Sequence, residues 1–176
     1  MAKHSIATVS LSGSLDEKLR AIVGAGFDAV EIFENDLLTF NGSPRDVGRL
    51  CRDLGLGICA FQPFRDFEGM PEPQRARNFA RAQHKFELMQ ELQTDLLLVC
   101  SNVSPASLGG IDRAPADFHA LGELAASCGL RRGGGERQER NERPDEFDAA
   151  ERSKHGGLLF LGLAFLGLAS VELAGA

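Results

Sequence analysis

Polar side chains that could bind a small molecule stand at the ends of short apolar segments in this 176-residue chain. The segment VEIFE carries Glu31, and GICAFQPF is followed by Arg65. A buried carboxylate must be hydrogen-bonded, paired with a cation or bound to a metal. Arg65 is a natural partner for Glu31, and its guanidinium could instead hold a substrate carboxylate through two parallel hydrogen bonds. The candidate site residues are Glu31, Gln62, Arg65, Ser101 and Asn102.

Structural roles are the alternative for this group, since Glu31 could simply form an ion pair and Arg65 could cap a loop. The histidines are weaker candidates because His84 and His119 fall within helical patterns among charged or polar neighbours, and His155 lies in a charged stretch. The segment GAGFDA, residues 24–29, is not a dinucleotide-binding loop. Its glycines precede an apolar strand, whereas that loop requires them between a strand and a helix.

Four apolar strand patterns alternate with four helical patterns along the first 130 residues. Strands that are apolar on both faces and alternate with helices predict a parallel sheet built of βα units. Ligands of such sheets bind at the carboxyl ends of the strands, where the candidate residues stand. The expected strands span 5–10, 28–34, 57–64 and 95–102, and the expected helices span 15–26, 44–55, 73–93 and 115–129.

The composition changes abruptly after Leu130. More than half of residues 131–155 are charged and none is Val, Ile or Thr, which predicts a disordered or solvated segment. Residues 156–176 are strongly apolar. Their uncharged part, 156–171, is shorter than the roughly 18 residues of a spanning helix, and Glu172 follows it, so a membrane anchor is disfavoured. The alternatives are an apolar helix that packs on another surface and a segment that does not fold.

Overall charge and cysteine content narrow the function classes. The net charge of −6 argues against nucleic-acid binding, which favours basic surfaces. The four cysteines form no CxxC pair and none has a histidine at metal-ligand spacing, as expected of a reduced cytoplasmic protein. The N-terminus has no apolar core typical of a secretory signal.

Four long blocks carry a family resemblance: SIATVSLSG, GFDAVEIFENDLL, FQPFRDFEGMP and KFELMQELQTDLLLVCSN. They closely resemble the N-terminal part of bacterial 3-dehydroshikimate dehydratases, a group within the xylose isomerase-like, sugar phosphate isomerase/epimerase TIM barrels, over about residues 4–130. The resemblance implies an eight-stranded barrel with a divalent metal (Mg, Mn or Co) at its mouth. It also implies a lyase that removes water from 3-dehydroshikimate to give protocatechuate in quinate and shikimate degradation. Arg65 would anchor the substrate carboxylate, and Glu31, Gln62, Ser101 and Asn102 would line the mouth.

The resemblance stops where the family's metal ligands begin. Those ligands come from strands five to eight, and this chain has RRGGGERQER after the fourth helix. Glu136 lies near the expected place of the first ligand, but no strand pattern surrounds it, so no metal ligand is assigned. A disrupted reading frame, a fusion and a truncated gene would each explain the change.

We therefore expect an α/β protein with an incomplete TIM (β/α) barrel of about four βα units in residues 1–130. The charged segment 131–155 and the apolar segment 156–176 would follow it. The chain would keep the substrate side and show little or no dehydratase activity. The alternatives are a sugar phosphate isomerase or epimerase of the same barrel group, and a non-enzymatic half-barrel that self-associates as a homo-oligomer or is tethered to a membrane.

Overall fold

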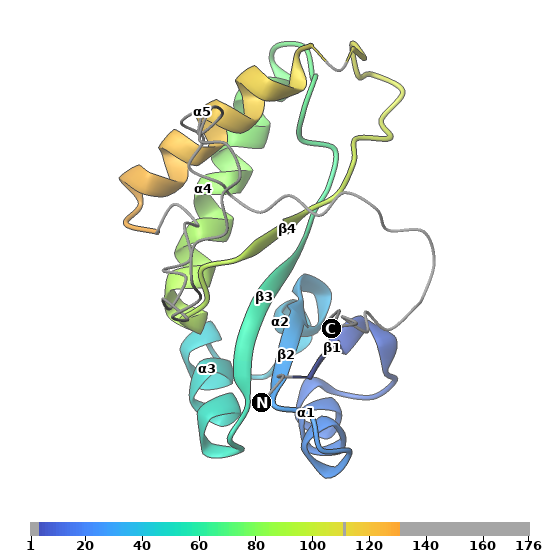
Figure 1. The fold of residues 1–176 in the computed structure, drawn as a ribbon, viewed down its shortest axis with the longest axis vertical. Helices are drawn as coiled ribbons and strands as arrows, with labels where there is room; N and C mark the ends of the chain where they lie inside the picture. Colours follow the sequence, from blue (N-terminus) through green and yellow to red (C-terminus); the bar gives the residue numbers. More distant parts are fainter. Residues whose placement is uncertain (1–3, 111, 131–176) are drawn as a thin grey trace, which may run out of the picture.

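The computed structural model describes residues 4–110 and 112–130, and this part is an α/β fold with one parallel sheet (Figure 1). The strands lie in the order β1-β2-β3-β4, so consecutive strands are neighbours. This order confirms the predicted succession of βα units. The elements are β1 (Ser5–Ala7), η1 (Thr8–Ser10), α1 (Leu15–Gly24), β2 (Ala29–Phe33), α2 (Glu34–Thr39), α3 (Pro44–Asp53), β3 (Gly57–Phe64), α4 (Gln74–Leu92), β4 (Leu97–Val99) and α5 (Ala114–Ser127).

Two helices begin at capping boxes that the sequence encodes. The Ser14 hydroxyl accepts a hydrogen bond from the Glu17 amide, and the Glu17 carboxylate accepts one from the Ser14 amide at 2.8 Å. Ser43 and Asp46 do the same for α3, with Pro44 at the first helical position. These reciprocal bonds satisfy amides that the first turn leaves unpaired, which fixes where α1 and α3 start.

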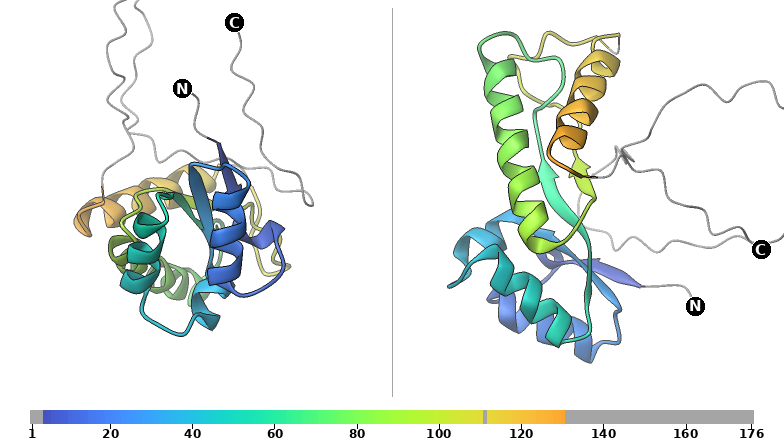
Figure 2. Two further views of the ribbon diagram at one scale, coloured as in Figure 1. Left: turned by 90° about the horizontal axis from the view of Figure 1, so that it is seen from below. Right: turned by 90° about the vertical axis from the view of Figure 1, so that its left-hand side faces the viewer.

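The two faces of the sheet differ in burial. Val30, Ile32 and Phe61 point to one face and are fully buried in a core shared with the helices. Glu31 and Phe33 alternate with them on β2 and are only partly buried. Figure 2 shows the curved sheet with its helices alongside. The outer, helix-covered face therefore holds the core, and the inner face carries Glu31, Phe33 and Gln62.

Strand β3 contains extra residues that have no paired residue in the neighbouring strands β2 and β4. Its pairing with β2 advances by two residues, from Ile58 to Ala60, where β2 advances by one. Its pairing with β4 advances from Phe61 to Phe64 where β4 advances only from Leu97 to Val99. Extra residues of this kind change which side chains share a face. Phe61 and Phe64 are three residues apart, yet both are fully buried.

The sheet ends at two unpaired edges within the described residues, because β1 pairs only with β2 and β4 pairs only with β3. A closed barrel has no such edges. The described residues thus form a partial barrel, as expected. The segments 131–155 and 156–176, with the predictions made for them, lie outside the described residues.

Several smaller expectations can be compared with the structure. β1 ends at Ala7, because a 3-10 turn takes residues 8–10, and β4 covers only three of the eight residues expected of it. His84 and His119 are exposed, as expected of surface histidines. All four cysteines are free. Within the described part of the chain, none of the helices is long and apolar enough to cross a membrane.

Candidate functional site

Because the strands are parallel, their carboxyl ends all lie at the same end of the sheet, and the segments that carry the five candidate residues follow one another there. This end of the sheet corresponds to the mouth of a TIM barrel, where active sites of that fold lie. We call it the mouth.

Glu31 and Gln62 meet on the inner face of the sheet. Gln62 Nε2 donates a hydrogen bond of 2.8 Å to Glu31 Oε2. Glu31 pairs in register with Ala60, so Gln62 lies diagonally across from it on the same face. Burial raises the pKa of the Glu31 carboxyl. The carboxyl, held in place by the neutral amide of Gln62, can accept a hydrogen bond from a substrate hydroxyl. When it is protonated, it can also donate one.

Arg65 does not pair with Glu31, so that predicted interaction is wrong. The Arg65 side chain is exposed, and its backbone carbonyl accepts a hydrogen bond from Arg81 Nη2 at 3.4 Å. Among the described residues no carboxylate lies within ion-pair distance of the Arg65 guanidinium. Arg65 is therefore a cation at the mouth that could meet an anionic group from solution.

Asn102 links the ends of β3 and β4. Its backbone amide donates to Glu68 Oε1 at 2.8 Å, and its side-chain amide donates to the Glu68 carbonyl. Its side-chain oxygen accepts from the Ser104 amide at 2.8 Å. Ser101 beside it is exposed. The side chain of Asn102 is thus used to hold the loop, while Ser101 stays open to solvent.

A second carboxylate at the end of β2 has an entirely different environment. Glu34, the first residue of α2, forms an ion pair with Lys85 of α4, and the Lys85 side chain is almost completely buried. Lys85 Nζ also lies 5.2 Å from the ring centroid of Phe61. Burial lowers the pKa of Lys85, and the hydrogen bond to Glu34 opposes that change.

The sequence interpretation did not identify Lys85, although a signal was present. The buried residues of α4 include Ala82, Lys85, Phe86 and Met89, so a lysine occupies the apolar stripe of an amphipathic helix. A lysine at such a position needs a buried acidic partner.

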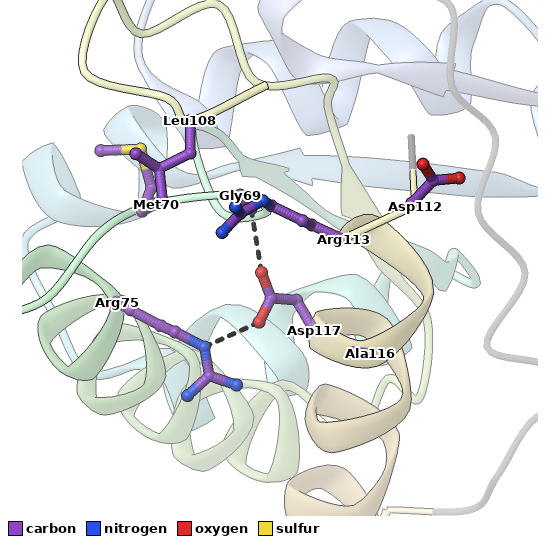
Figure 3. A pocket seen from close by; sticks show the side chains of 8 residues that line it. All are labelled: Gly69, Met70, Arg75, Leu108, Asp112, Arg113, Ala116 and Asp117. Atoms are coloured by element: carbon purple, nitrogen blue, oxygen red, sulfur yellow. Dashed lines mark hydrogen bonds and ion pairs between the residues drawn. The ribbon is translucent and has the colours of Figure 1, made fainter. Parts of the chain in front are cut away.

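A cavity lies beside the mouth loops, away from Glu31 (Figure 3). It has a volume of about 350 Å³. Asp117 of α5 accepts hydrogen bonds from the Gly69 amide at 2.9 Å and from Arg75 Nε at 2.8 Å along its wall. Because both carboxylate oxygens are occupied, these bonds join the loop after β3 to α5 and to α4. The cavity is lined by Gly69, Met70, Arg75, Leu108, Asp112, Arg113, Ala116 and Asp117.

The described residues do not form a metal site. No group of three or more His, Cys, Asp or Glu side chains that could hold a metal occurs in residues 4–110 and 112–130. Glu31 contributes a single carboxylate, and its observed partner is an amide. A divalent cation at this mouth would therefore need most of its ligands from outside these residues.

Comparison with known proteins agrees with this architecture. The family described as xylose isomerase-like TIM barrel matches residues 19–133. The chain belongs to this family. A curated 3-dehydroshikimate dehydratase of Pseudomonas aeruginosa is 63% identical over 131 residues, which are 74% of this chain and 21% of that protein. The chain thus spans about a fifth of the length of that relative.

Two solved structures are also similar to this chain. A xylose isomerase-like TIM barrel/4-hydroxyphenylpyruvate dioxygenase fusion protein is 59% identical, with a TM-score of 0.70 over 74% of this chain and 21% of that chain. The IOLI protein, solved with a bound zinc atom, is 14% identical, with a TM-score of 0.65 over 74% of this chain and 50% of that chain. The second likeness shows the fold alone.

Proposed function

We propose that residues 4–130 are the substrate-binding part of a 3-dehydroshikimate dehydratase-type barrel. The reaction is the loss of water from 3-dehydroshikimate to give protocatechuate. The observation that carries this proposal is the 63% identity with a curated 3-dehydroshikimate dehydratase over 131 residues. The arrangement at the mouth supports it, since a carboxyl, an amide and a guanidinium with no ion-pair partner among the described residues are suited to a hydroxylated carboxylic acid.

Each candidate residue has a role that follows from its surroundings. Arg65 is exposed and faces no carboxylate among the described residues, so it binds the substrate carboxylate. Gln62 holds Glu31 through the 2.8 Å hydrogen bond, and Glu31 contacts a ring hydroxyl of the substrate. Ser101 and Asn102 line the neighbouring wall. In this proposal Arg65 and Glu31 contact the substrate, Gln62 and Asn102 position their neighbours, Ser101 lines the wall, and none of the five abstracts the proton.

The proposal includes a divalent metal, but it does not assign the metal's ligands to the described residues. When bound, a divalent cation of this family would polarise a carbonyl oxygen and stabilise the negative charge that develops on it. Residues 4–110 and 112–130 do not supply its donor set. We therefore propose that the 176-residue chain alone binds the substrate and turns it over slowly or not at all.

A direct assay tests both parts of this proposal. The purified chain is mixed with 3-dehydroshikimate and Mg²⁺, Mn²⁺ or Co²⁺, and protocatechuate is followed by its ultraviolet absorbance. Calorimetry of 3-dehydroshikimate binding is measured on the same sample. We expect binding without appreciable turnover. Rapid turnover would contradict the proposal that the chain lacks the metal ligands, and absence of binding would contradict the proposed substrate-binding role. Keto-sugars serve as comparison ligands, and preferred binding of one of them would favour an isomerase or epimerase.

The free state of all four cysteines supports a reducing, cytoplasmic location as part of this proposal.

A further inference from the structure

The first part of the loop between β3 and α4, residues 65–69, carries Arg65, the proposed anchor of the substrate carboxylate. The backbone of Arg65 is held on both of its sides. The Phe64 carbonyl, just before it, accepts a hydrogen bond of 2.8 Å from the Cys100 amide. Its own carbonyl accepts one of 3.4 Å from Arg81 Nη2. Because the backbone conformation limits the side-chain rotamers, groups that hold these peptides also limit where the guanidinium can reach.

Asn78, on the buried face of α4, holds the next two peptide groups of this segment. Its Nδ2 donates to the carbonyl oxygens of Asp66 and Phe67, at 2.6 Å and 3.2 Å. Its Oδ1 accepts from Arg81 Nη1 at 2.9 Å, so the same arginine contacts Asn78 and the Arg65 carbonyl. A buried amide whose donors and acceptor are all engaged makes the groups that it contacts rigid. Two side chains of α4 therefore hold the consecutive carbonyls of residues 65, 66 and 67.

Asp66 has a backbone conformation that needs such support. Its φ angle is 53°, in the left-handed region that residues other than glycine seldom adopt. Such conformations persist where the surrounding contacts over-determine them, and they cluster at ligand-binding sites. The contacts here are the Asn78 amide and the Val103 amide, which donates to Asp66 Oδ1 at 3.1 Å. The strained residue lies directly beside Arg65, which favours a binding role for the arrangement.

We propose that Asn78 is a positioning residue, which fixes the segment that carries Arg65 and so directs the guanidinium toward the substrate carboxylate. This inference rests on the proposed function. Asn78 is 6% exposed and its amide is fully engaged, so it acts through Arg65 and does not contact the substrate itself. Asn78→Ala would leave two carbonyls without these donors, and the segment would lose its single conformation.

A double-mutant cycle with Arg65 tests this role, by calorimetry of 3-dehydroshikimate binding to the full chain. We expect Asn78→Ala to weaken binding by roughly fivefold, approaching the effect of Arg65→Ala. In the Arg65→Ala background the same substitution should change the affinity by less than about twofold, because the positioned group is already absent. Equal losses in both backgrounds would mean that Asn78 supports the fold in general, and would overturn the proposal.

Nitrogen-15 relaxation of the backbone amides of Arg65, Asp66 and Phe67 tests the same role without a ligand. We expect order parameters of about 0.85 in the wild type and below about 0.6 in Asn78→Ala. Unchanged order parameters would overturn the proposal. If the wild-type chain does not bind 3-dehydroshikimate, the proposed function is wrong, and the order parameters alone decide whether Asn78 fixes the segment.

Met89→Ala is the matched control for a general loss of stability. Met89 is 1% exposed and lies on the same helix as Asn78, roughly 16 Å away along the helix axis. This variant should keep the wild-type affinity and order parameters. If Asn78→Ala does not fold, Arg81→Ala replaces it and the same results decide, because it removes the bonds to Asn78 and to the Arg65 carbonyl. Arg77→Ala, at an exposed position of α4, is then the control.

Discussion

Glu31 and Glu34 stand three residues apart at the same end of β2, yet their carboxylates serve different parts of the molecule. Glu34 turns to the outer side and meets Lys85, a cation buried against phenyl rings. Glu31 turns to the inner side and meets the neutral amide of Gln62. Charge pairing suits a carboxylate whose task is to hold a turn in place, while a neutral partner leaves hydrogen-bonding capacity for a ligand. The end of β2 therefore carries a structural carboxylate, Glu34, and a carboxylate that is available to a ligand, Glu31.

Replacement of Lys85 tests the structural half of this contrast and has the largest expected effect. Lys85→Ala removes the partner of Glu34 and leaves a gap beside Phe61 and Phe64. We expect the free energy of unfolding to fall by about 3 kcal/mol, near the lower end for breaking a buried pair, because Glu34 keeps some contact with water. Urea denaturation measures this change. The control Arg49→Ala breaks the exposed pair with Asp46 and should cost less than about 1 kcal/mol. Equal losses in both variants would remove the distinction.

Replacement of Arg65 tests whether the mouth residues contribute to substrate binding and not to the stability of the fold. Arg65→Ala should weaken binding of 3-dehydroshikimate by roughly tenfold, as expected for loss of a charge-assisted hydrogen bond. Its unfolding midpoint should stay unchanged, because Arg65 is exposed. Calorimetry of ligand binding checks the first expectation. Arg45→Ala on α3 is the matched control, since that side chain is 79% exposed. Unaltered affinity in the Arg65 variant would exclude it from the binding site.

Glu31 gives the smallest and most specific effect, a change in how stability depends on pH. Burial raises the pKa of Glu31 above its ordinary value of 4.5, so the folded state holds its proton more tightly than the unfolded state. The corresponding stability is fully present below pH 4.5 and is lost as pH rises through the folded-state pKa. Glu31→Gln lacks this loss. The variant should therefore gain stability relative to the wild type between pH 4 and pH 7, by less than the Lys85 effect. A constant difference across this pH range, measured by urea denaturation, would contradict the raised pKa.

The sequence was sufficient for most of the fold because its local signals agree with one another. The capping boxes at Ser14 and Ser43 and the apolar runs of β2 and β3 each mark the same boundaries that packing produces. The short helix α2 was missed. Its six residues are too few for a helical period to be visible, and its first turn continues the polar end of β2.

The site was predictable only in part. Strand ends identified which residues stand at the mouth, since that depends on the order of elements. The partners did not follow, because Glu31 reaches Gln62 and not Arg65 as a result of an extra residue in β3 between Ile58 and Ala60. Strict alternation from Ile58 would turn Gln62 toward the helices. The position of such an irregularity depends on tertiary pairing, which one sequence does not display.

The extra residues in β3 also determine which single-residue deletions this strand could tolerate. Removal of Cys59 would restore regular alternation and leave Phe61 packed outward and Gln62 directed inward, since Cys59 is the residue that β2 does not match. Loss of a residue outside Ile58–Ala60 and the second irregular segment, Phe61–Phe64, would instead exchange side chains between the core and the inner face. Tolerance of deletions in β3 should thus be confined to its two irregular segments, Ile58–Ala60 and Phe61–Phe64.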